Sequence, residues 1–251
     1  MKAMILAAGY GTRLQPLTNH LPKALVAIND VPMLQLIIAR LIKSGVDEII
    51  INTHHFADEI AAFLKAKNNF GIQIELSHEN EILGTGGGLK KAEYFFDDNQ
   101  PFFLHNVDIL STIDLKQIYR YHHDNRAMAT LAIQQRDTSR GFIVDEQNNI
   151  CGHEDKDNQR TRLKRAPKGK TQFMAFCGIH VISPELFHYL EESGRFSIID
   201  TYLKLIEQGF PILGFPADKF YWKDIGKLET LEEIHQELNT GIITISNLTR
   251  A

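Results

Sequence analysis

The sequence predicts an α/β protein with a Rossmann-like, mixed and mainly parallel sheet flanked by helices. Three observations support this prediction. Short apolar runs such as 2–6 and 48–53 are typical of buried strands, and segments with apolar residues at helical spacing alternate with them. The connections are short, which favours parallel strands joined by right-handed crossovers. Because ligands of such sheets bind beyond the carboxyl ends of the strands, the loops that follow strands are the first place to look for function.

Composition sets the broad class. The 251 residues are 43% apolar, enough for one large or two small domains with a packed core. A formal net charge of −4 gives no electrostatic reason to expect nucleic acid as a partner. The two cysteines, Cys151 and Cys177, have no zinc-like spacing and suit inert thiols in a reducing compartment, although a disulfide between them stays open. With no leader pattern and no apolar run of membrane-spanning length, we expect a cytoplasmic protein without a membrane partner.

The loop after the first predicted strand carries the strongest functional signal. From Leu6 to Thr18 it reads L-A-A-G-Y-G-T-R-L-Q-P-L-T, and Lys23 follows shortly after. Glycine lacks the Cβ that would keep a ligand away, so backbone N–H groups here can turn outward and hold a phosphate. Arg13 suits two-pronged contact with phosphate oxygens, and Lys23 supplies a mobile point charge. The loop therefore predicts a phosphate-binding site.

Two better-known glycine motifs fit this loop badly. A dinucleotide fingerprint would need a third glycine where Leu14 stands, and Pro16 interrupts the helix that should receive the pyrophosphate. The G-x-x-x-x-G-K-[ST] pattern of a P-loop does not occur. A nicotinamide-dependent dehydrogenase is thus disfavoured.

The next segments continue the alternation. Pro32 opens a predicted helix that ends at Gly45, and a strand over 48–53, a helix through 60–64 and a strand over 72–76 follow. His54 and His55 stand at a strand-to-helix junction and invite a metal hypothesis, but no further ligand at matching spacing is evident. We therefore do not assign metal binding to this pair.

A second glycine cluster reads E-I-L-G-T-G-G-G over 81–88 and precedes a helix predicted over 89–95. Consecutive glycines at a helix start let the backbone approach a flat ligand and offer free N–H donors. A flexible loop is the alternative interpretation.

Two aspartates follow predicted strands far apart in the sequence. The apolar strand at 101–104 runs into His105-Asn106-Val107-Asp108, and Asp224 follows a short strand at 220–223. A carboxylate at a strand end is a suitable magnesium ligand. For Asp224 alone, capping of the helix predicted from residue 228 is an alternative.

The second half of the chain is predicted as strands at 129–134, 173–182 and 211–215, a hairpin over 141–151 and a helix that begins at Ser197. The basic segment 155–170 has no apolar period, and a solvated loop is favoured over a phosphate clamp. The tail 240–251 carries no strong pattern.

The run from Leu6 to Leu25 closely resembles the signature of the sugar-1-phosphate nucleotidyltransferases, L-A-A-G-x-G-T-R-L-x-P-L-T followed by P-K-x-L. The resemblance continues in the segment at 81–87, in Asp108, in the F-C-G-I at 176–179 and in the W-x-D-x-G at 222–226. Two departures stand out: Val107 replaces a usual glycine, and the E-K-P whose lysine binds the sugar phosphate in many relatives is missing. We therefore assign that role to no lysine.

The resemblance implies roles for individual residues. It implies the nucleotide-diphospho-sugar transferase fold without a β-helix domain, Mg²⁺ as cofactor, and a nucleoside triphosphate and a sugar 1-phosphate as small-molecule partners. The catalytic residues implied are Arg13, Lys23 and Asp108, and the metal ligands are Asp108 and Asp224. The implied nucleotide-binding residues are Leu6, Ala8, Gly9, Gly11, Thr12, Arg13, Glu81, Thr85, Gly86 and Gly87. The sugar-binding candidates are Asn106, Gly178 and Asp200.

The resemblance spans residues 2–238 and predicts one nucleotidyltransferase domain over 1–239, with a nucleotide-binding part of about 1–125 and a sugar-binding part of about 126–239. It fixes the reaction better than the substrate. UTP with N-acetylmuramate 1-phosphate is preferred; GTP with mannose or heptose 1-phosphate and CTP with phosphocholine remain alternatives. A non-catalytic nucleotide-binding regulatory subunit is the alternative of another class, and the oligomeric state is not readable from the sequence.

Overall fold

The computed structural model describes residues 1–249, which form two compact units. Unit 1 comprises residues 1–82, 105–115 and 220–249, and unit 2 comprises 83–104 and 116–219. The two units are defined by internal contacts, and the last segment of the described chain belongs to unit 1. The functional boundary expected near residue 125 stays a prediction.

Unit 1 contains a parallel ladder of β1 (Lys2–Leu6), β4 (Glu48–Thr53) and β5 (Gln73–His78), in the order β1-β4-β5. The apolar strand β4 is central in this ladder, and Ile49, Ile50 and Ile51 are fully buried. The connections contain α1 (Met33–Lys43) and α2 (Ala57–Ala66). The sequence predicts Pro32 as the first residue of this helix; in the structure Pro32 is the N-cap, one residue before α1, and Gly45, with φ +100°, follows the helix. The alternation of strand and helix expected here is confirmed.

Two shorter pairs of strands complete unit 1. β2 (Ala27–Ile28) and β3 (Val31–Pro32) form a small hairpin. β7 (Ile109–Ser111) pairs antiparallel with β14 (Trp222–Asp224), so segments far apart in the sequence become neighbours. The unit ends with α6 (Leu228–Asn239) and α7 (Ile245–Leu248), the latter inside the tail for which the sequence shows no strong pattern.

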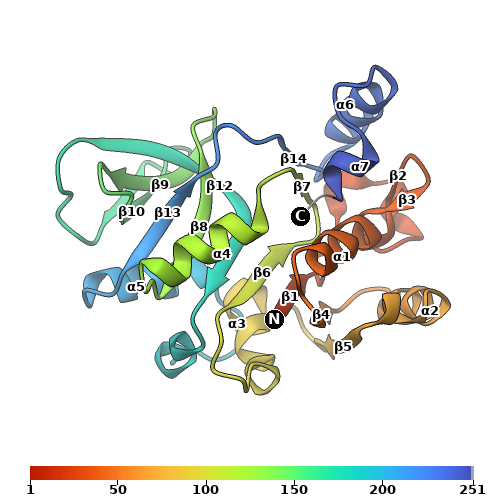
Figure 1. Ribbon diagram of the computed structural model, residues 1–251, viewed down its shortest axis with the longest axis horizontal. Coiled ribbons are helices and arrows are strands. Elements are labelled where there is room, and N and C mark those ends of the chain that lie inside the picture. Colours follow the sequence, from red (N-terminus) through yellow and green to blue (C-terminus); the bar gives the residue numbers. More distant parts are fainter. Residues whose placement is uncertain (250–251) are drawn as a thin grey trace. The chain divides into compact units, whose positions relative to one another are not determined.

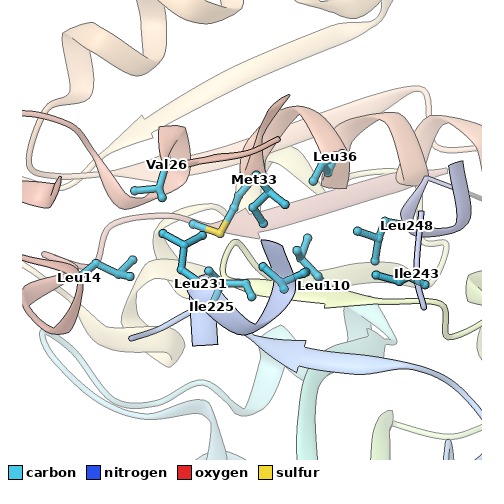
Figure 2. Packing of buried hydrophobic residues seen from close by; sticks show 11 residues of the cluster. Leu14, Val26, Met33, Leu36, Leu110, Ile225, Leu231, Ile243 and Leu248 are labelled. Carbon is cyan, nitrogen blue, oxygen red and sulfur yellow. The ribbon is translucent and has the colours of Figure 1, made fainter. Parts of the chain in front are cut away.

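The C-terminal helices pack on the N-terminal part of unit 1. Figure 1 shows α6 and α7, in blue, beside β2, β3 and α1, in red and orange. Figure 2 shows the apolar cluster that joins them. Its buried members are Leu14, Val26, Ile28, Met33, Leu36, Leu110, Ile225, Leu231, Ile234, Ile243 and Leu248. Leu14 belongs to the predicted phosphate loop, and Ile225 directly follows Asp224. The cluster therefore fixes the backbone of the phosphate loop and the backbone next to Asp224.

Unit 2 contains a mixed ladder in the order β11-β10-β9-β12-β8-β13. Its strands are β8 (Ala129–Gln134), β9 (Arg140–Asp145), β10 (Ile150–Asp155), β11 (Arg160–Leu163), β12 (Thr171–Ile182) and β13 (Ile212–Pro216). Only β8 and β13 pair in parallel among these strands. The strand β6 (Phe102–Asn106) crosses from unit 2 into unit 1 along the chain.

The helices of unit 2 are α3 (Gly84–Lys91) and α5 (Ile198–Glu207), and α4 (Leu115–Asp124) begins at the boundary with unit 1. The helix predicted over 89–95 in fact starts five residues earlier, inside the glycine cluster, and gives way to a 3₁₀ turn at Glu93–Phe95. The sequence favours a solvated loop over 155–170, but this segment includes β11, whose residues pair with β10. Exposed side chains on this edge strand explain why no apolar period marks it.

The predicted α/β class with a mixed sheet flanked by helices is confirmed. The strand pairs within the ladder of unit 1 are parallel, and those of unit 2 are mostly antiparallel. Residues 1–249 contain no β-helix. Among the helices of the described chain, none combines the length and the apolar character needed to cross a membrane.

Candidate active site

The phosphate loop begins at a buried polar junction between three strand ends. The Ala7 amide, just after β1, donates to Asn52 Oδ1 at 2.7 Å, and Asn52 Nδ2 donates to Glu79 Oε1 at 2.7 Å. Asn52 and Glu79 are 3% and 1% exposed. Since buried polar groups are costly unless they are hydrogen-bonded, this chain of bonds fixes where the loop leaves the sheet. Sequence reasoning missed both residues; an asparagine ending the apolar run E-I-I-I-N-T was the available signal.

The loop itself presents open backbone amides. Within residues 1–249, the amides of residues 8–11 donate to no other protein group. Gly9 is exposed, and a Cβ placed on it would meet no atom within 4 Å. Gly11 has φ +67°, and a Cβ there would lie 3.0 Å from Lys23 Cβ and 3.0 Å from Thr18 Cγ2. Gly11 is thus required by the backbone, whereas Gly9 leaves space that a ligand can use.

Tyr10 and His54 connect the loop tip to the end of β4. The Tyr10 hydroxyl lies 3.1 Å from His54 Nε2, and His54 Nδ1 lies 2.7 Å from the Glu79 carbonyl oxygen. Because a carbonyl oxygen only accepts hydrogen bonds, Nδ1 carries the proton and Nε2 accepts from Tyr10. Both ring nitrogens of His54 therefore take part in positioning the loop.

The two predicted metal carboxylates come from neighbouring chain segments. Asp224 pairs with Ile109 across the β7–β14 ladder, and the Ile225 amide donates to the Asp108 carbonyl oxygen at 2.8 Å. Asp108 Oδ2 accepts a hydrogen bond from Lys23 Nζ. The Lys23 and Asp108 side chains are only 11% and 19% exposed, so this ion pair is largely removed from solvent.

Arg13 lies beside the second carboxylate. A Cβ built on Gly226 would lie 2.7 Å from Arg13 Nη2 and 2.7 Å from Asp224 Oδ1. Gly226 is buried and has no positive φ, so glycine is needed here for space. The absence of a side chain at Gly226 lets the Arg13 guanidinium and the Asp224 carboxylate approach the same point.

These residues fit a magnesium ion that is shared with a substrate. Mg²⁺ in phosphate-transfer sites usually takes one or two carboxylates and fills its remaining positions with water and phosphate oxygens. Within residues 1–249, no group of three or more His, Cys, Asp or Glu side chains gathers so as to hold a metal ion. Asp108 and Asp224 supply the two carboxylates of the shared arrangement. The Asp108 carboxylate already faces a cation, the Lys23 ammonium, which shows that it can hold positive charge in this position.

The remaining predicted residues of unit 1 lie at the ends of its strands and in the loop. The Val107 amide donates to the Leu6 carbonyl at 3.1 Å, and Val107 is 4% exposed, so its side chain is covered by protein. Asn106 ends β6 and is partly buried. Earlier in the chain, Ala8 is buried, whereas Thr12 and Glu81 are exposed.

In unit 2, the second glycine cluster packs against residues 194–198. A Cβ on Gly86 would lie 2.3 Å from the Phe196 ring, and one on Gly87 would lie 2.3 Å from the Gly194 carbonyl oxygen. The Gly86 amide already donates to the Phe196 carbonyl at 3.1 Å. Close packing within unit 2 therefore accounts for these glycines. The amide of Gly86 is not a free donor, although the nucleotide-binding role predicted for the segment stays a prediction.

Thr85 also has a local role in unit 2. Its Oγ1 accepts a hydrogen bond from the Ile198 amide at 3.0 Å, and the N-cap Ser197 accepts from the Ile199 amide at 3.3 Å. Two of the unpaired amides at the start of α5 are thereby satisfied, which confirms Ser197 as the N-cap.

The two other sugar-binding candidates lie on different elements of unit 2. Gly178 has φ +70° and sits where the β12–β8 register shifts between Phe176 and His180, so a β-bulge requires the glycine. Asp200, in the first turn of α5, pairs with Arg162 of β11 and is half exposed. Their contact with a sugar stays a prediction.

Comparison with known protein families shows which family this chain belongs to. The family model described as "Nucleotidyl transferase" matches residues 2–241. The chain belongs to the nucleotidyl transferase family. The resemblance drawn from the loop at residues 6–25 is thereby confirmed.

Relatives in the family include both uridylyl- and guanylyltransferases. The chain is 32% identical over 246 residues to a UTP–glucose-1-phosphate uridylyltransferase of Synechocystis, covering 91% of this chain and 61% of the relative. It is 30% identical to a mannose-1-phosphate guanyltransferase 2 of Candida glabrata, covering 98% of this chain and 70% of the relative. The chain thus spans less than two thirds of the length of the first of these nucleotidyl transferases.

A solved structure shares the fold. The protein HddC from Yersinia pseudotuberculosis, crystallised with GMP-PN, superposes with a TM-score of 0.75 at 22% sequence identity, covering 94% of this chain and 99% of that one. At this level of identity the similarity concerns the fold of the nucleotidyl transferase family, and substrate choice must be argued separately.

Proposed function

We propose that this chain transfers a nucleotidyl group from a nucleoside triphosphate to a sugar 1-phosphate, giving an NDP-sugar and pyrophosphate. The observation that carries the proposal is the cluster in unit 1, where open loop amides, two cationic side chains and two carboxylates gather beyond the strand ends. Such a combination serves a reaction between two anions, which repel each other unless positive groups hold them. Membership of the nucleotidyl transferase family supports the same reaction.

The reaction is a direct displacement. An oxygen of the sugar phosphate attacks the α-phosphorus of the triphosphate in line, a new P–O bond forms, and the bond to the β-phosphate oxygen breaks with pyrophosphate as leaving group. No covalent enzyme intermediate is required. Catalysis then consists mainly of holding the two substrates in the right geometry and of neutralising their negative charge.

The residues of the cluster divide this work. The open amides around Gly9 and Gly11 and the Arg13 guanidinium hold the β- and γ-phosphates. Lys23 draws the α-phosphate and the sugar phosphate together. Asp108 and Asp224 hold Mg²⁺, which when bound supplies positive charge next to the reacting phosphates.

The preferred substrate pair is UTP with N-acetylmuramate 1-phosphate. The G-T-G-G-G segment and the missing E-K-P resemble the uridylyltransferases that act on N-acetylmuramate 1-phosphate, and the uridylyltransferase relative supports uridine as the base. GTP with mannose 1-phosphate is the second candidate, because the guanyltransferase relative is 30% identical across 98% of the chain.

The direct test measures pyrophosphate release in the presence of Mg²⁺. The four ribonucleoside triphosphates and dTTP are each combined with N-acetylmuramate, mannose, glucose and heptose 1-phosphates and with phosphocholine. We expect one productive pair that contains a sugar 1-phosphate. Failure of every pair, combined with an increase in melting temperature on addition of nucleotide, would contradict the proposal and favour a regulatory nucleotide-binding protein.

A further inference from the structure

Lys23 and Asp108 bind each other, although each of them is predicted to bind a ligand. The proposed function assigns Lys23 to phosphate and Asp108 to a divalent cation. In the structure, the Lys23 ammonium donates to Asp108 Oδ2, and both side chains are more than four-fifths buried. The group that should attract the anion is therefore held by the group that should attract the cation.

The surroundings of Lys23 keep it in this position. Lys23 opens the 3₁₀ turn Lys23–Leu25, and the packing of its stem is tight, since a Cβ on Gly11 would lie 3.0 Å from Lys23 Cβ. The Asp108 backbone is fixed by the hydrogen bond from the Ile225 amide. Both partners thus have restrained backbones, and only the ends of the side chains need to move for the pair to separate.

The pairing of Lys23 with Asp108 has a clear physical reason. A cation or a carboxylate that is largely removed from water is costly when it stands alone, and the cost falls when the two charges meet. Binding of a metal ion to Asp108 removes the partner of Lys23. Binding of a phosphate to Lys23 removes the partner of Asp108.

We infer that Lys23 is a built-in competitor of the divalent cation for Asp108, so that the metal ion and the phosphate chain bind by exchanging the two partners of one ion pair. This inference rests on the proposed function. It makes the binding of metal and phosphate mutually dependent, because each ligand releases the residue that the other needs. The metal ion alone is held weakly, because it must displace the Lys23 ammonium from Asp108. Lys23 and Asp108 both have opposite charges beside them again once the metal ion and the phosphate are bound together.

The first test measures Mn²⁺ binding by calorimetry or electron paramagnetic resonance, without nucleotide. Lys23→Met keeps most of the length of the side chain and removes the competing charge, so it should bind Mn²⁺ about tenfold more tightly than the wild type. Lys43→Met is the matched control, because it removes the same charge from an exposed position of α1 in unit 1. Its Mn²⁺ affinity should stay at the wild-type value. Equal or weaker Mn²⁺ binding by a folded Lys23→Met variant would overturn the inference.

A second variant tests the same exchange from the side of the anion. Asp108→Asn frees Lys23, so inorganic tripolyphosphate should bind several-fold more tightly in the presence of EDTA than it binds to the wild type. Asp30→Asn, in the exposed turn before β3, removes the same charge elsewhere in unit 1 and should leave this affinity unchanged. Tripolyphosphate binding that is unchanged in Asp108→Asn, or equally improved in Asp30→Asn, would refute the exchange.

Both binding tests are made without turnover. A protein that shows the exchange but releases no pyrophosphate in the substrate panel would leave the partner exchange standing and remove the proposed reaction. Pyrophosphate release by the wild type, with no change of Mn²⁺ affinity in Lys23→Met, would leave the proposed reaction standing and remove the partner exchange.

Discussion

Gly226 tests, at the scale of one residue, whether Arg13 and Asp224 must meet. A Cβ at this position would lie 2.7 Å from both charged groups, and both are side-chain ends that can move aside. Gly226→Ala should therefore leave the free energy of unfolding within about 1 kcal/mol of wild type. It should lower kcat/KM by about tenfold or more, because the displaced groups no longer converge on the phosphates. Kinetics and thermal unfolding of the same variant check both parts, and normal kinetics would show that the convergence is not needed.

Gly9 and Gly87 form a second residue-scale contrast. A Cβ on Gly87 would lie 2.3 Å from a backbone carbonyl oxygen, whereas one on Gly9 would meet nothing. Gly87→Ala should lower the unfolding free energy by about 2 kcal/mol or more, since backbone must shift to make room. Gly9→Ala should keep wild-type stability and raise the KM for the nucleotide, because its added methyl occupies space reserved for the phosphates. Equal stability of the two variants, measured by denaturant unfolding, would contradict this contrast.

At the scale of elements, helix α6 depends on its apolar face. Ile234 is fully buried in the cluster of Figure 2, and that cluster also holds Leu14 of the loop and Ile225 beside Asp224. Ile234→Ala should cost about 2–4 kcal/mol of unfolding free energy through lost contacts and a cavity. Ile242→Ala is the control, since Ile242 is 70% exposed and its truncation should cost less than about 0.5 kcal/mol. A chemical unfolding series distinguishes the two, and similar losses would argue against the packing described for α6.

The elements also show what the sequence can predict. Strands such as β4 and the helix after Pro32 follow from local apolar periodicity and capping, and the loop at 6–25 identified its family by residue identity. The start of α3 inside the glycine cluster did not follow, because Gly86 and Gly87 are explained by packing on residues 194–196, far along the chain. The roles of Asn52 and Glu79 could not be predicted for the same reason, because each depends on a hydrogen-bonded partner far away in the sequence.

At the scale of the whole molecule, buried histidines link stability to pH. Burial, and to a lesser degree the neighbouring His123, lowers the pKa of His122 from 6.5 to about 4, and its ring bonds to Thr130 and Ser183. Between about pH 6.5 and pH 4, His122 therefore binds a proton in the unfolded chain but stays neutral in the folded chain. The stability that depends on neutral His122 is present above pH 6.5 and is lost as the pH falls from there toward 4.

The expected loss through His122 is about 2–3 kcal/mol between about pH 7.5 and about pH 4.5. His122→Gln should be less stable than wild type at neutral pH but lose less stability on acidification. It should keep a remaining slope, because burial also lowers the pKa of His105 to about 4. His188→Gln is the control, since the His188 side chain is also in unit 2 but exposed, and the variant should follow the wild-type profile. An unchanged pH profile of unfolding in His122→Gln would contradict this linkage.

The most direct test of the account as a whole is the rate of magnesium-dependent pyrophosphate release by Asp108→Asn and Asp224→Asn with the productive substrate pair. The proposed site requires both carboxylates, so each variant should lose activity by about a thousandfold or more while its circular dichroism spectrum stays that of the folded wild type. A folded variant of either aspartate that retains a tenth or more of the wild-type rate, with the same dependence on magnesium, would contradict the assignment of this pair as the catalytic centre.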